Sequence, residues 1–166
     1  MTKAQSFSKA QNKLAAYDQE TRNLMLDAME FEDIHTEHFS LPEMVYLLRN
    51  SFKQRITYHD VFGNIDMETR DNVDPSAGFC MVSSYLIYSL TGGDKVWELH
   101  GTFLHWWLYH KQTHTIFDIT NTQFTPQELQ AHYHHGRPVD KLKTDPTFHD
   151  VLKTKAHILA HRAGLE

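Results

Sequence analysis

Cysteine is almost absent from this chain, because Cys80 is the only one among its 166 residues. An internal disulfide is therefore excluded. A free thiol stays reduced in the cytoplasm, and the N-terminal residues lack the apolar core of a signal peptide. We therefore expect a cytoplasmic protein.

Long hydrophobic runs and an excess of basic residues are also missing. No apolar run approaches the length of a membrane span. The formal net charge of −5 argues against binding to the phosphate backbone of a nucleic acid. Membranes and nucleic acids are therefore not expected as partners.

The chain has no internal repeat, no low-complexity segment and no evident linker. Its length suffices for one domain with a real core. We expect residues 1–166 to form a single domain of class α+β. A helical N-terminal part (1–70) would precede a core (71–124) and C-terminal helices (125–166).

The stretch around the cysteine predicts a helix. Apolar side chains recur at helical spacing at Val82, Tyr85, Leu86 and Leu90. A turn-rich entry at 74–78 and the pair Gly92-Gly93 mark its ends. Cys80 would lie at the positive end of the helix dipole, which favours the thiolate. The alternative is a buried, inert cysteine.

Three strands are predicted after this helix, at Val96 to His100, Thr102 to His110 and Thr115 to Thr120. A tight polar turn at 111–114 would place Trp107 opposite Asp118. His105 would then lie on the same face, two residues along, within reach of that carboxylate. An ordinary strand histidine and a turn-proximal charge are the alternatives.

A thiol, an imidazole and a carboxylate are the parts of a cysteine-nucleophile triad. Cys80 would be the nucleophile, His105 the base, and Asp118 the group that fixes the imidazole tautomer. The backbone N–H of Cys80 could donate to the oxyanion, with Asn72 as a candidate second donor.

The neighbouring tryptophans Trp106 and Trp107 are candidates for lining a substrate cleft. Only one of them can share the face of His105, because side chains alternate along a strand. The other is expected in the core.

The stretch contains four short motifs: N-x-D-P-S-x-G-x-C (Asn72 to Cys80), L-T-G-G (Leu90 to Gly93), H-W-W (His105 to Trp107) and F-D-I-T-x-x-Q-F (Phe117 to Phe124). In order and spacing they resemble the YunG-like family, which is similar to the papain-like and transglutaminase-like superfamily. The resemblance covers roughly residues 70 to 130. It implies a papain-like core with Cys80 as nucleophile, His105 as base and Asp118 as its orienter. Many relatives carry Gln just before the cysteine, where this chain has Phe79.

The flanking segments predict further helices. Residues 8–33 read as one or two amphipathic helices. Ser40 to Glu43 forms a capping box for a helix that ends near Phe52. Ile56 to Val61 and Ile65 to Met67 could form a hairpin.

C-terminal to the third strand, Thr125 to Glu128 forms a second capping box, for a helix that Gly136 ends. Asp145-Pro146 opens a last helix. Its apolar side would comprise Phe148, Val151, Leu152, Ile158 and Leu159.

Histidine is abundant, with 13 residues. The run His132 to His135 and the pair His157 and His161 could suggest a metal site. No full set of four ligands accompanies them, so we expect solvated helix ends, no metal and no cofactor.

The sequence thus favours a papain-like cysteine hydrolase or acyltransferase that acts on an amide, isopeptide or thioester bond. The substrate would be a protein, a peptide or a small amide. A papain-like binding module without turnover is the alternative, and a His-rich metal-binding protein is a third possibility.

Overall fold

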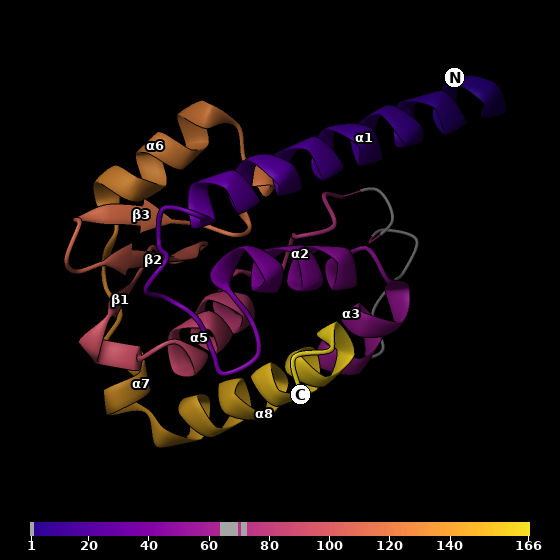
Figure 1. The fold of residues 1–166 in the computed structure, drawn as a ribbon. Helices are drawn as coiled ribbons and strands as arrows, with labels where there is room; N and C mark the ends of the chain where they lie inside the picture. Colours follow the sequence, from indigo (N-terminus) through magenta and orange to yellow (C-terminus); the bar gives the residue numbers. More distant parts are fainter. Residues whose placement is uncertain (1, 64–69, 71–72) are drawn as a thin grey trace.

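The computed structural model describes residues 2–63, 70 and 73–166. The fold is α+β, as predicted, with helices around a small antiparallel sheet (Figure 1). The helices are α1 (Lys3–Ala28), α2 (Leu41–Phe52), α3 (Arg55–Phe62), α5 (Cys80–Leu90), α6 (Pro126–His135), α7 (Lys141–Thr144) and α8 (Pro146–Ala163). The strands are β1 (Trp97–Gly101), β2 (Trp106–His110), β3 (Thr115–Phe117) and β4 (Arg137–Pro138). Two short 3₁₀ helices, η1 (Gly93–Lys95) and η2 (Asn121–Gln123), complete the chain.

The sheet has the order β3-β2-β1-β4 and is antiparallel throughout. Leu108 pairs with Phe117, which confirms the register predicted from the polar turn. The strands are shorter than predicted, however. β2 begins after His105 and β3 ends before Asp118, so both side chains lie just beyond strand ends.

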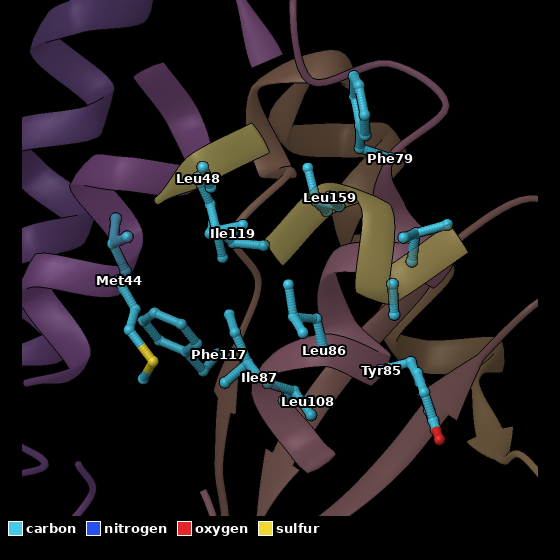
Figure 2. Packing of buried hydrophobic residues seen from close by; sticks show 14 of the residues in the cluster. Met44, Leu48, Phe79, Tyr85, Leu86, Ile87, Leu108, Phe117, Ile119 and Leu159 are labelled. Carbon is cyan, nitrogen blue, oxygen red and sulfur yellow. The ribbon is translucent and has the colours of Figure 1, made fainter. Parts of the chain in front are cut away.

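Helix α5 is the centre of the core. It packs against β1 and β2 on one side and against α8 on another (Figure 1). Apolar side chains from α2, α5, α8 and the sheet meet in one cluster, which includes Leu48, Ile87, Leu108 and Leu159 (Figure 2). Because α5 is buried on several sides, even its serines Ser83 and Ser84 are withdrawn from solvent, and their hydroxyls donate to backbone carbonyls.

Side-chain caps fix the starts of three helices, as the sequence predicts. Ser40 accepts a hydrogen bond from the Glu43 backbone N–H at the start of α2. The reciprocal capping box is complete at α6, between Thr125 and Glu128. Asp145 caps α8 by accepting from the backbone N–H of Phe148.

Two expectations for the flanking segments were wrong. Residues 55–62 form helix α3 instead of a hairpin strand, because Thr57 and Val61 are buried one helical turn apart. The second predicted hairpin strand, 65–67, lies outside the described residues. Val151 on α8 is exposed rather than core. The sequence also did not predict β4 or α7.

Arg49 on α2 is fully buried, which the sequence did not predict. Its guanidinium donates to the Thr21 hydroxyl at 2.7 Å and to the Ile119 carbonyl at 2.7 Å. It also lies over the Tyr17 ring, 3.9 Å from the ring centroid. Burial lowers the pKa of Arg49, while Tyr17 and Asp74 raise it. Arg49 therefore joins α1 to the backbone next to Asp118.

We expect Arg49→Met to destabilise the fold by about 2–4 kcal/mol, because buried oxygens of Thr21 and Ile119 lose their donor. The free energy of unfolding in urea measures this. Arg22→Met is the matched control, because Arg22 lies on the exposed side of α1. Equal stability of the two variants would contradict a structural role for Arg49.

Candidate active site

Cys80 is the first residue of α5, where the sequence placed it. No side chain caps this helix start, so the positive end of its dipole acts at the thiol. The side chain is 6% exposed. Phe79, the preceding residue, is stacked on Phe52 with ring centroids 4.4 Å apart. The Phe79 ring is therefore part of the core and helps to fix the start of α5.

The loop before Cys80 is tied to the segment that follows Asp118. Asp74 accepts from the backbone N–H of Ser76 at 2.8 Å and from the Thr122 hydroxyl at 3.1 Å. Arg70 donates to the carbonyls of Asp74, Pro75 and Ala77, and its guanidinium lies over the Tyr58 ring. These contacts connect the loop before Cys80 with Arg70 and with the segment that follows Asp118.

His105 and Asp118 form a buried hydrogen-bonded pair. The distance from Nε2 of His105 to Oδ2 of Asp118 is 2.6 Å, and the two residues are 0% and 4% exposed. Asp118 also accepts from the Tyr133 hydroxyl at 2.7 Å and from the backbone N–H and hydroxyl of Thr120. A buried carboxylate is costly unless it is hydrogen-bonded and paired, and this one is both.

The electrostatics of the site favour an imidazolium at His105. Burial lowers the pKa of His105, but the hydrogen bond with Asp118 and the neighbouring Cys80 sulfur outweigh it and raise the pKa to about 9. Nε2 of His105 is hydrogen-bonded to Asp118, so Nδ1 is the ring nitrogen that could interact with the thiol. Nδ1 is buried and forms no hydrogen bond with any described residue. Contacts of this kind are often loose before a substrate binds.

Helix α6 supplies residues that sequence reasoning missed. The Tyr133 hydroxyl donates to Asp118. Burial and the charge of Asp118 both raise the pKa of this phenol, so it remains a neutral donor.

His132, also on α6, has its ring centroid 5.6 Å from that of His105 and is hydrogen-bonded to the Thr102 hydroxyl at 2.8 Å. Burial and the charge of His105 lower the pKa of His132. Phe124, just before α6, packs its ring against His105 at 4.8 Å. The only sequence signal for this arrangement was the capping box that starts α6.

Three further residues were predicted for the site. Asn72, the candidate oxyanion donor, lies outside the described residues. Trp106 and Trp107 are 6% and 1% exposed, so both are core residues rather than cleft walls. Trp106 contacts Phe148 of α8, and Trp107 packs against Tyr133. Within the described ranges, no three His, Cys, Asp or Glu side chains gather as a metal ion would require.

Comparison with known proteins gives no relative, since no family model, curated protein or solved structure matches the chain. Over the described part of the chain, none of the helices combines the length and the apolar character needed to cross a membrane.

The raised pKa of His105 predicts a measurable titration. NMR of the imidazole should give a pKa near 9 in the wild type and a lower one in Asp118→Asn. Because the folded pKa exceeds the unfolded value of about 6.5, the stabilisation is complete below pH 6.5 and is lost as the pH rises through about 9. The stability difference between wild type and Asp118→Asn should shrink over that window. A His105 pKa at or below 6.5 in the wild type would contradict the ion-pair geometry.

Proposed function

We propose that the protein is a cysteine hydrolase or acyltransferase that acts on an amide, isopeptide or thioester carbonyl. The observation that carries the proposal is the buried His105–Asp118 pair, which lies beside the only thiol of the chain at a helix N-terminus. A hydrogen-bonded imidazole beside a thiol is the arrangement that activates cysteine as a nucleophile.

The reaction follows from the protonation states. The Cys80 thiolate attacks the carbonyl carbon, and a C–S bond forms as the carbonyl electrons move to oxygen. When the tetrahedral intermediate collapses, the His105 imidazolium gives its proton to the departing amine or thiol. Asp118 keeps Nε2 occupied, so this proton comes from Nδ1. Water or an amine, deprotonated by the neutral imidazole, then attacks the thioester and releases Cys80.

The oxyanion of the intermediate would form at the start of α5. The backbone N–H of Cys80 belongs to the uncapped first turn, which carries the partial positive charge of the helix. Such preorganised donors stabilise developing charge without reorganisation during the reaction.

The order of the elements also supports membership of the papain-like and transglutaminase-like superfamily. The thiol lies on a central helix, and the histidine and aspartate lie at the ends of neighbouring antiparallel strands that follow it. Together with the motifs around Cys80 and Phe124, this supports a YunG-like protein. A reduced thiol fits the cytoplasm as its location.

A binding module without turnover is the second candidate. The low exposure of Cys80 favours it, because a nucleophile must be reached by a carbonyl carbon. The two candidates differ in the reactivity of the thiol toward a small electrophile, which needs no knowledge of the substrate.

We expect iodoacetamide to alkylate Cys80 at pH 6 faster than it alkylates a free cysteine peptide, with one label per chain. At pH 6 the rate should fall about tenfold or more in His105→Ala, because the imidazolium that stabilises the thiolate is lost. Asp118→Asn should have a smaller effect, since Asp118 acts through the imidazole.

His161→Ala on the exposed side of α8 is the control and should leave the pH profile unchanged. Wild type and His105→Ala with the same profile as a free cysteine peptide would refute the activated nucleophile and leave the binding module as the better proposal.

A further inference from the structure

A cleft of about 710 Å³ borders the proposed active site. One wall is α1, which contributes Ala16 and Tyr17. Val73 and Asp74, which precede the Cys80 helix, form a second wall. The third consists of the residues Asn121 to Phe124 together with Pro126 and Leu129. Its volume lies in the range of about 300–1,000 Å³ that is typical of ligand sites.

Residues that line the cleft also contact His105 or belong to the loop before Cys80. Phe124 lines the cleft and packs against the His105 imidazole at 4.8 Å. Asp74 lines it from the nucleophile loop and accepts from the Thr122 hydroxyl on the other wall. The cleft is therefore bounded by the loop that enters Cys80 and by the segment that follows Asp118.

Two amide side chains in the wall contain atoms without partners. Oδ1 of Asn121, an acceptor, and Nε2 of Gln123, a donor, are buried and have no hydrogen bond to any described residue. Buried polar atoms are rarely left unpaired, and such exceptions call for an explanation. Both residues belong to η2, directly after the triad aspartate.

We propose that this cleft binds the polypeptide backbone of the substrate. A peptide unit presents one N–H and one C=O, which match the acceptor of Asn121 and the donor of Gln123 once these side chains turn toward it. Val73, Phe124 and Leu129 give the same cleft an apolar surface for a substrate side chain. The inference rests on the proposed function and names its substrate class as a peptide or protein rather than a small amide.

Two chloromethyl ketones that carry the same reactive group test this. Acetyl-Ala-Leu-Gly chloromethyl ketone has a backbone, whereas chloroacetone has none. In both, the Cys80 thiolate displaces chloride, so a C–S bond forms and a C–Cl bond breaks. The rate of alkylation by the peptide reagent divided by the rate with chloroacetone measures recognition of the peptide, because the reactivity of the thiol affects both rates alike. A third reagent, with glutamine in place of leucine, separates binding of the backbone from binding of a side-chain carboxamide.

We expect the rate ratio of the wild type to exceed that of a free cysteine peptide. Gln123→Leu should lower it about three- to tenfold, the effect of one net hydrogen bond. Ala16→Trp should lower it about tenfold or more by filling the cleft. Gln127→Leu and Ala15→Trp are the matched controls, because both residues are exposed and lie outside the cleft wall. The chloroacetone rate should not change in the two control variants.

A ratio that stays unchanged in both Gln123→Leu and Ala16→Trp would overturn the proposal. So would a ratio that rises only with the glutamine reagent. Failure of the proposed function gives a different result, since chloroacetone itself would then react with Cys80 no faster than with a free cysteine peptide.

Discussion

The hydrogen bond between His105 and Asp118 is the contact on which the arrangement of the site depends. Both partners are almost completely withdrawn from solvent. Removing a carboxylate and an imidazolium from water costs several kcal/mol per ion, and the pair is tolerable only with further donors. Tyr133 and Thr120 provide these, so α6 and the end of β3 must be in place before the pair can form. The geometry of the His105–Asp118 pair thus depends on donors from α6 and from the segment that follows β3.

A second hydrogen-bond network connects this pair to the loop before Cys80. Arg49 donates to the Ile119 carbonyl, one residue after Asp118, and to the hydroxyl of Thr122. Thr122 in turn donates to Asp74, which organises the loop before Cys80. The helical N-terminal part therefore also organises the site, because the buried Arg49 connects the segment that carries Asp118 with the loop before Cys80.

Local patterns predicted the parts of the site that lie close together in sequence. The polar turn between β2 and β3 fixed which residues face each other, so the approach of His105 to Asp118 followed from side-chain alternation. The glycine-rich flanks and apolar spacing placed Cys80 at the start of α5. The prediction of a strand at the position of α3 was wrong because a short apolar run fits a strand and a helix equally well.

Tertiary packing determined the rest, and the sequence has no local signal for it. Hydropathy assigns an arginine to the surface, yet Arg49 is buried because carbonyls and hydroxyls from distant segments surround it. Tyr133 and His132 reach the triad only because α6 packs against the β1–β2 connection and the end of β3. One tryptophan next to His105 was expected in the core, and this is confirmed, whereas the second is also buried because helices cover both of them.

The most direct test of the central claim is to trap the acyl-enzyme. Mixing the protein with p-nitrophenyl acetate should release a burst of p-nitrophenol close to one equivalent per chain, and mass spectrometry should find the acetyl group on Cys80. The burst rate should fall about 100-fold or more in His105→Ala, as expected when a nucleophile loses its general base. The account would be contradicted if wild type and His105→Ala formed the acetyl adduct at the same rate as a free cysteine peptide.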